Sequence, residues 1–158
     1  MLPFDRYREK GRKLLGRPEQ GDATCRHGYG LAVFAQCGLS CVYCGRFLGK
    51  PYDAWLDISV DHVIPRSIFW SNERREWIED IANMVTCCRA CNEFLNRFKV
   101  DVPLPESLSA FFDLRDRIFL EKREHALRRH KEESGWYERW SERWSKTKTK
   151  WEGDKGES

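Results

Sequence analysis

The sequence has no apolar run that approaches the roughly 20 residues a membrane-spanning helix needs. Its first residues, Met1 to Arg6, also lack the apolar segment of a secretory signal peptide. These absences argue against a membrane partner and predict a cytoplasmic protein in a reducing compartment. There, paired cysteines are more often metal ligands than disulfides, which bears on the seven cysteines of this chain.

A strong excess of one charge is missing as well. The chain carries 28 lysines and arginines against 25 acidic residues, a formal net charge of +3. So small an excess does not by itself indicate nucleic-acid binding, and positive charge would have to be clustered locally to matter. No internal repeat is visible, and the length of 158 residues favours one compact domain with extensions.

What the sequence does contain divides it into four segments. A basic N-terminal extension (1–30) precedes the expected core (31–102), and two prolines mark the start of a C-terminal helical extension (103–145). The charged tail (146–158) has the composition of a disordered segment. Sequence pattern predicts the elements: a helix near 4–15, strand or helix at 31–36, a strand over 54–63 ending at Asp61-His62, a strand near 84–86, a helix over 91–98 and a helix from 107 to about 133.

Four of the seven cysteines form two knuckles of matching spacing, Cys41-x-x-Cys44 and Cys88-x-x-Cys91. A C-x-x-C turn lets two thiolates converge on one ion, and two such turns complete a tetrahedron. This pattern favours a zinc site over a set of free buried thiols. Because four sulfur ligands leave no position for water, the zinc is expected to be structural.

The other three cysteines are interpreted as ordinary small apolar side chains. Cys87 adjoins Cys88 and could compete for the metal, but Cys88 is favoured because it keeps the two-residue spacing. Cys37 is a better candidate for a spare ligand than Cys25. A zinc bound by both knuckles would close residues 45–87 into a loop, and such a cross-link stabilises a small domain.

Polar residues suited to phosphodiester hydrolysis lie inside and just after that loop. Asp61-His62 is followed by Asn83, and Asn92 comes directly after the second knuckle. Histidine is mostly neutral at pH 7 and can act as a base, and carboxylate and amide oxygens suit Mg²⁺ or Mn²⁺. Strand alternation would point Asp61 and His62 to opposite faces, so the pattern leaves their common geometry open.

These motifs together resemble those of the HNH endonuclease family, also called His-Me finger nucleases. The resemblance runs from about Leu31 to Lys99. It implies an α+β fold: a small ββα-metal core with the C-x-x-C zinc site, flanked by N-terminal and long C-terminal helices. The stretches that carry it are Cys41-Val-Tyr-Cys44-Gly45, Val60-Asp61-His62-Val63-Ile64-Pro65-Arg66-Ser67, Asn83-Met84-Val85-Thr86 and Cys88-Arg89-Ala90-Cys91-Asn92.

The resemblance also implies a role for each residue of the site. His62 would be the general base, and Asp61 and Asn92 would hold the catalytic Mg²⁺ or Mn²⁺. Asn83 would bond across the hairpin loop and hold the histidine in place. Many members have a lysine three residues after the last asparagine, where this chain has Leu95, so another basic residue would have to contact the phosphate.

Basic residues near the site are the candidates for nucleic-acid contacts, with a solvated surface charge as the alternative for each: Arg66, Arg89, Arg97 and Lys99. The long helix carries mixed charges typical of an exposed face with ion pairs. Its apolar stripe is expected to pack on the core, with a dimer or DNA contact as alternatives. The tryptophans Trp136, Trp140 and Trp144 are expected to pack rather than to stack on bases.

The sequence therefore predicts a metal-dependent DNA endonuclease with structural Zn²⁺ and catalytic Mg²⁺ or Mn²⁺. DNA is the expected partner, RNA is a weaker candidate, and a homodimer is left open. The main alternative is a zinc-binding nucleic-acid adaptor without cleavage, and a third is a zinc-stabilised protein-interaction module. The combination of His62 with Asp61 and Asn92 favours the enzyme, because an adaptor needs neither a base nor metal-binding oxygens.

Overall fold

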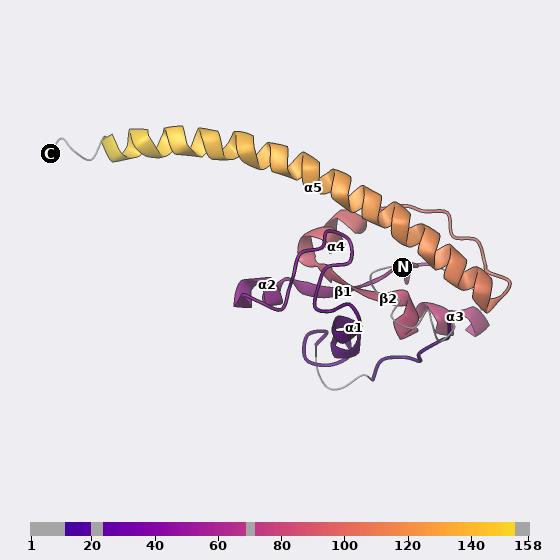
Figure 1. The fold of residues 1–158 in the computed structure, drawn as a ribbon. Coiled ribbons are helices and arrows are strands. Elements are labelled where there is room, and N and C mark those ends of the chain that lie inside the picture. The colour runs from indigo at the N-terminus through magenta and orange to yellow at the C-terminus, as the bar shows by residue number, and fades with distance from the viewer. Residues whose placement is uncertain (1–11, 20–23, 69–71, 154–158) are drawn as a thin grey trace. The chain divides into compact units, whose positions relative to one another are not determined.

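The computed structural model describes residues 12–19, 24–68 and 72–153, and the chain divides into two compact units, Met1–Ala126 and Leu127–Ser158. The first unit contains every element up to the first part of the last helix, and the described part of the second unit continues that helix. The elements are α1 (Gly30–Gln36), α2 (Tyr52–Leu56), β1 (Ile58–His62), α3 (Asn72–Ile78), the 3-10 turn η2 (Ile81–Asn83), β2 (Met84–Cys88), α4 (Arg89–Leu95) and α5 (Leu108–Gly153) (Figure 1).

The centre of the first unit is an antiparallel pair formed by β1 and β2. Its register places Ile58 opposite Cys88 at one end and His62 opposite Met84 at the other. Because a strand rises about 3.4 Å per residue, the four steps between these ends separate the second knuckle from His62 by roughly 14 Å. Helix α4 follows β2 without an intervening loop. Strand, strand and helix thus form the predicted α+β core of ββα type.

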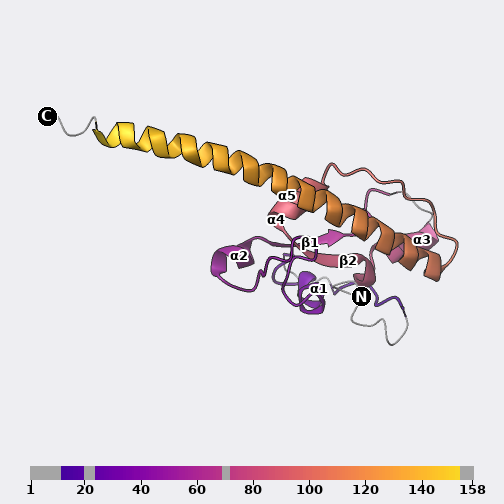
Figure 2. The same cartoon turned by 45° about the horizontal axis from the view of Figure 1, so that its top comes forward.

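Helices cover both sides of this strand pair. Figures 1 and 2 show α1 on one side and the first part of α5 on the other. All five residues of β2 are buried as a result. Val33 and Phe34 of α1 belong to the same core cluster as the aromatic residues of α5. The apolar stripe predicted on the long helix is confirmed, because four of its members are buried: Phe111, Phe112, Ile118 and Phe119.

The segment before β1 differs from the prediction. The strand expected over 54–63 begins only at Ile58, and the preceding residues form α2. In this one-turn helix the amide of Trp55 donates to the carbonyl of Pro51 at 3.1 Å, and only Ala54 is buried. Apolar residues two positions apart cannot distinguish a single helical turn from the start of a strand. The run at 31–36, which the sequence left open, lies within α1.

The N-terminal segment also differs where the structure describes it. Most of the helix expected near 4–15 lies outside the described residues, and residues 12–19 have no regular secondary structure. The amides of Leu15 and Gly16 instead donate to the buried carboxylate of Asp80, at 2.9 and 2.7 Å. Gly16 has a φ of +86°, a conformation in which other residues are strained. Over residues 12–15, the backbone is not helical, and contacts with a distant carboxylate hold its last residue and the next.

Helix α5 is longer than predicted, because it continues past Glu133 to Gly153. It includes residues 146–153 of the segment expected to be disordered, and residues 154–158 lie outside the description. Gly135 costs about 1 kcal/mol within a helix, which neighbouring helix formers and the pair Arg129–Glu133 at 2.8 Å help to offset. Among the described helices, none has the length and apolarity required to cross a bilayer.

The tryptophan stripe of the second unit does not pack into a core among the described residues, contrary to the prediction. Trp136, Trp140 and Trp144 are 65, 57 and 57% exposed. The rings of Trp140 and Trp144 stack along the helix, with centroids 6.1 Å apart. A spacing of four residues brings side chains together on one helix face, so the pattern predicted the helix correctly but not the burial of its face.

Candidate functional site

The two cysteine knuckles meet at one end of the strand pair. The Sγ atoms of Cys41, Cys44, Cys88 and Cys91 all lie within 4.8 Å of one another. In the first knuckle, Gly45 has a φ of +79° and its amide donates to the carbonyl of Cys41 at 2.8 Å, which closes the turn. The second knuckle spans the junction of β2 and α4, because Cys88 ends the strand and Cys91 lies in the helix. Within this knuckle, the sulfur of Cys88 accepts a hydrogen bond from the amide of Cys91 at 3.5 Å.

The cluster has the dimensions of a tetrahedral zinc site. The Sγ atoms of Cys44 and Cys88 are 3.8 Å apart, and four sulfurs bound at about 2.3 Å around zinc are separated by about 3.8 Å. Hydrogen bonds from the thiols of Cys41, and then of Cys88 and Cys91, hold the pKa of Cys44 well below its usual range. The same hydrogen bonds raise the pKa values of Cys88 and Cys91, so without a metal the negative charge is concentrated on Cys44. The four predicted ligands are positioned for a metal.

The remaining cysteines stand outside this cluster, as predicted. Cys87 is buried, and burial raises the pKa of its thiol well above the usual value. Cys37 is also buried, and its sulfur accepts from the amide of Thr86 at 3.3 Å. Neither sulfur belongs to the group that could hold the ion. The two-residue spacing therefore distinguished Cys88 from its neighbour correctly.

Asn83 crosses the loop that follows His62. Its side chain is fully buried, and its amide oxygen accepts from the backbone amide of Ile64 at 2.9 Å. The amide nitrogen donates to the carbonyls of Ile64 and Ile78 at 3.0 and 2.9 Å. The backbone adds a fourth bond, from the amide of Val63 to the carbonyl of Asn83 at 2.9 Å. This arrangement fastens the chain immediately after His62.

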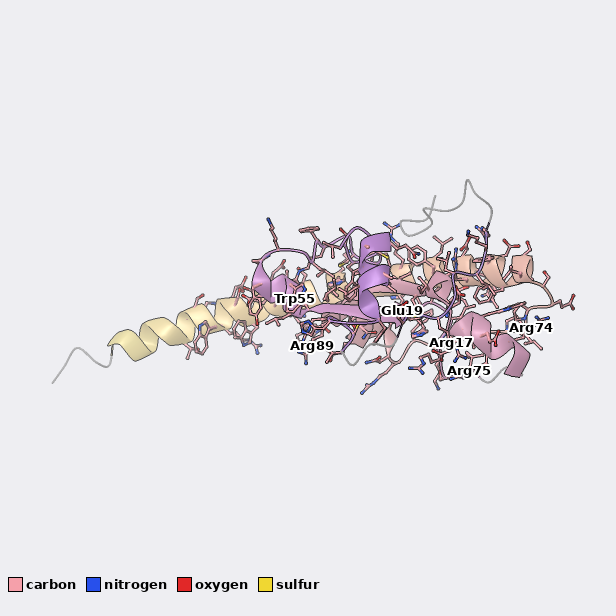
Figure 3. All side chains as sticks on the ribbon, turned by 90° about the horizontal axis from the view of Figure 1, so that it is seen from below. Arg17, Glu19, Trp55, Arg74, Arg75 and Arg89 are labelled. Carbon is pink, nitrogen blue, oxygen red and sulfur yellow. The ribbon has the colours of Figure 1, made fainter. Side chains whose placement is uncertain are left out.

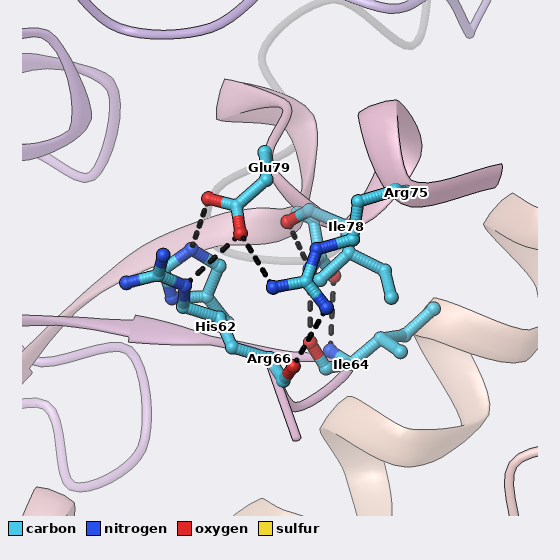
Figure 4. A network of polar contacts seen from close by, with 7 residues as sticks. His62, Ile64, Arg66, Arg75, Ile78 and Glu79 are labelled. Carbon is cyan, nitrogen blue, oxygen red and sulfur yellow. Dashed lines mark hydrogen bonds and ion pairs between the residues drawn. The ribbon is translucent and has the colours of Figure 1, made fainter. Parts of the chain in front are cut away.

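His62 lies at the end of β1 beside Glu79. Its Nε2 is buried without a hydrogen-bond partner in the described structure and lies 3.9 Å from Oε2 of Glu79. The other oxygen, Oε1, accepts from Arg66 at 3.0 Å and from Arg75 at 3.4 Å (Figure 4). Burial lowers the pKa of His62, and this effect exceeds the opposing influence of Asp61 and Glu79. The imidazole is therefore held in its neutral form at pH 7.

Asp61 is bound from two sides through a single oxygen. Its Oδ2 accepts from the hydroxyl of Tyr43 at 2.5 Å and from Nζ of Lys122 at 2.8 Å. Burial, reinforced by the Asp61 carboxylate, raises the pKa of Tyr43 well above its usual value, so its hydroxyl remains a donor. Among the described residues, none makes a hydrogen bond or ion pair with Oδ1. Asp61 therefore keeps one oxygen available for a ligand.

One cavity of about 570 Å³ unites three of the predicted site residues, Asp61, His62 and Asn92. The side-chain nitrogen of Asn92 donates to the hydroxyl of Ser59 at 3.2 Å, which leaves its amide oxygen available. Strand alternation had left a common cavity for neighbours on β1 in question, yet the structure supplies one. His62 also lines a second cavity of about 350 Å³, together with Glu79 and three arginines.

The predicted basic contacts divide into two groups. Arg66 and Lys99 line the larger cavity. Arg89 and Arg97 are exposed but are not part of that lining. In Figure 3, Arg89 lies near Trp55, well away from Arg74 and Arg75 of α3. Only half of this predicted set is therefore gathered at the candidate site.

Three residues of the site were not identified from the sequence: Tyr43, Glu79 and Lys122. Tyr43 lies within the first knuckle, where the sequence pattern predicted metal-binding cysteines and gave no sign of a hydroxyl donor. Lys122 belongs to the mixed-charge helix that was interpreted as an exposed face. The structure corrects this interpretation for Lys122 and Arg115, which are only 3 and 2% exposed. Position on a helix opposite strand β1, rather than residue type, distinguishes Lys122 from its exposed neighbours.

Comparison with known proteins agrees with this geometry. Residues 41–97 match the family model described as HNH endonuclease, and this segment includes both knuckles, both strands and α4. No curated protein and no solved structure matches the chain. The matched segment contains the ββα core and the four-cysteine cluster that the family resemblance implied. Residues 41–97 are therefore the part of the chain that is similar to the HNH endonuclease family.

Proposed function

We propose that the protein is a metal-dependent endonuclease that hydrolyses phosphodiester bonds in DNA. The observation that supports this function is the cavity shared by His62, Asp61 and Asn92. It combines a neutral imidazole with a carboxylate and an amide oxygen, which are the groups that a one-metal hydrolysis requires. A nucleic-acid adaptor would need no such combination.

In this proposal His62 is the general base. Burial lowers its pKa, so the neutral imidazole can accept a proton from an attacking water at pH 7. Asn83 maintains the position of the loop after His62 through its bonds to Ile64 and Ile78. Glu79 lies near Nε2 and can stabilise the positive charge that the ring gains when it accepts the proton.

The same cavity offers ligands for a hard divalent cation. Asp61, through its available oxygen, and Asn92, through its amide oxygen, would hold Mg²⁺ or Mn²⁺. Such an ion would supply Lewis-acid stabilisation of the charge that develops on the phosphate. Arg66 and Lys99 line the cavity and would contact the neighbouring phosphates of the strand. The four cysteines would hold a separate, structural zinc.

The replacement of His62 by alanine tests this function. Incubation with supercoiled plasmid and Mg²⁺ or Mn²⁺ should show nicking by the wild type, and chelation of the divalent ion should stop it. His62→Ala should cut at least about a hundredfold more slowly, which is the usual contribution of a general base. His27→Ala is the matched control, because His27 is exposed and lines neither cavity. Both variants should retain one zinc per chain.

Two results would contradict the proposal in different ways. Equal cleavage by the wild type and His62→Ala would show that His62 is not the base. Absence of any cleavage by the zinc-loaded wild type, with several DNA forms and both metals, would favour the adaptor function instead.

A further inference from the structure

Lys122 of α5 reaches the end of the strand that carries the candidate site. Its Nζ donates to Oδ2 of Asp61 at 2.8 Å and to the carbonyl of His62 at 2.7 Å. The side chains of Lys122 and Asp61 are 3 and 14% exposed, so both charges lie largely out of water. Exposed pairs on the same helix differ, since Arg117 and Glu121 are 46 and 40% exposed. Lys122 also lines the larger cavity.

The contacts of Asp61 show what this ammonium does for the carboxylate. Oδ2 accepts from both Lys122 and Tyr43, whereas no described residue makes a hydrogen bond or ion pair with Oδ1. A buried carboxylate without a cation is strongly unfavourable. When no divalent ion is bound, the ammonium of Lys122 therefore supplies the positive charge that stabilises Asp61. A divalent ion on the same carboxylate is repelled by that ammonium, because charges at close range interact strongly in a poorly hydrated site.

We propose that Lys122 is an internal cation that holds Asp61 in place in the metal-free protein and keeps divalent-metal binding there weak. The proposal rests on the proposed function, because it requires Asp61 to be a metal ligand. Lys122 is then a positioning residue: it fixes the carboxylate and the end of β1, and it determines how much divalent ion the site requires. An ion pair that only fastened α5 would affect stability without weakening metal binding.

Mn²⁺ binding to the zinc-loaded, full-length protein without DNA tests this role. Binding is measured by titration calorimetry, and the rise in Tm with saturating Mn²⁺ is measured in parallel. Lys122→Met removes the charge and retains most of the side-chain volume. We expect this variant to bind Mn²⁺ about tenfold more tightly than the wild type, because the repulsion is gone. Its metal-free Tm should be lower, and its gain in Tm with Mn²⁺ should be larger.

Two further variants serve as controls for charge and for helix surface. Lys122→Arg retains the positive charge and should bind Mn²⁺ with nearly wild-type affinity. Arg117→Met breaks the exposed pair with Glu121 on the same helix and should leave Mn²⁺ binding unchanged. Unchanged or weaker Mn²⁺ binding by folded Lys122→Met would overturn the proposal.

Loss of folding and failure of the metal site are distinguished by two additional proteins. If Lys122→Met does not fold, Lys122→Gln takes its place, because its amide can still donate to Asp61 without a charge. If neither folds even with saturating Mn²⁺, the pair is structural and the proposal is overturned. Asp61→Asn should abolish Mn²⁺ binding; if it does not, the proposed metal site and the role of Lys122 both fail. If it does and the neutral Lys122 variants bind like the wild type, only the role of Lys122 fails.

Discussion

The side chain of Asn83 is fully buried and makes three hydrogen bonds to the backbone of Ile64 and Ile78. Ile64 lies in the loop after β1, and Ile78 is the last residue of α3, where a carbonyl has no partner within the helix. An unsatisfied buried polar group costs about 1–3 kcal/mol. Asn83 therefore stabilises the loop and, through the adjoining residues, the position of His62. The role inferred from the family resemblance is compatible with these contacts and stays a proposal until it is tested.

Asn83→Ala should destabilise the protein substantially, because it leaves three buried backbone groups without partners. We expect a loss of about 3 kcal/mol or more in the free energy of unfolding, measured by urea denaturation. Cleavage should fall as well if the loop positions His62. Asn96→Ala is a suitable control, because Asn96 is an exposed residue that also lines the larger cavity. A stability loss below 1 kcal/mol for Asn83→Ala would show that the loop holds its shape without the amide.

The cysteine cluster joins two segments that lie far apart in the chain. One knuckle lies in a turn after α1, and the other joins β2 to α4. Within the first unit, the amide of Val42 donates to the carbonyl of Thr86 at 3.0 Å, which ties the first knuckle to β2. The pair of strands is short, with five residues each. Short strands are marginal by themselves, so a metal bound by the four cysteines would contribute much of their stability.

Loss of one ligand should therefore destabilise the strand pair. Cys88→Ser should lower the zinc content below one per chain and reduce the Tm by roughly 10 °C or more, because structural zinc contributes directly to folding. Cys87→Ser is the matched control on the same buried strand, since its sulfur lies outside the cluster. It should keep one zinc, as measured by metal analysis of the purified protein. Equal zinc content in both variants would contradict the assignment of Cys88 as a ligand.

The first unit is completed by the first part of α5 rather than by the matched segment alone. Phe111, Phe112, Ile118 and Phe119 are buried in the same cluster as residues of α1 and β2. Burying one such side chain contributes about 1.5–3 kcal/mol, so together they amount to a large part of a domain's net stability of about 5–15 kcal/mol. The ion pair of Lys122 with Asp61 lies on the same stretch of helix.

Two truncations test the extent of the folding unit. A protein ending at residue 126 should fold and bind one zinc, because residues 1–126 form a compact unit. A protein ending at residue 106 should be insoluble or molten, because it lacks the four buried side chains of α5. Near-UV circular dichroism and zinc analysis measure both outcomes. A well-folded protein ending at residue 106 would show that α5 is an accessory to the core.

The sequence by itself determined the candidate metal ligands of this protein and much of its local structure. Ligand type and spacing along the chain predicted the cluster of Cys41, Cys44, Cys88 and Cys91, and apolar pattern predicted strand β2 and the buried stripe of α5. The order of Asp61-His62 and Asn92 around these knuckles indicated the HNH family. These features depend on chemical type and on short separations, which a sequence displays directly.

Only the tertiary structure decided what surrounds those residues. Lys122 is 61 positions from Asp61 and carries the same charge as exposed residues beside it on α5, so only packing against β1 reveals its role. Glu79 reaches His62 because the chain turns back between the two strands. α2 replaced the start of a predicted strand because one helical turn and an alternating run share the same apolar spacing. Contacts between distant segments follow from the shape of the folded core, which no local pattern encodes.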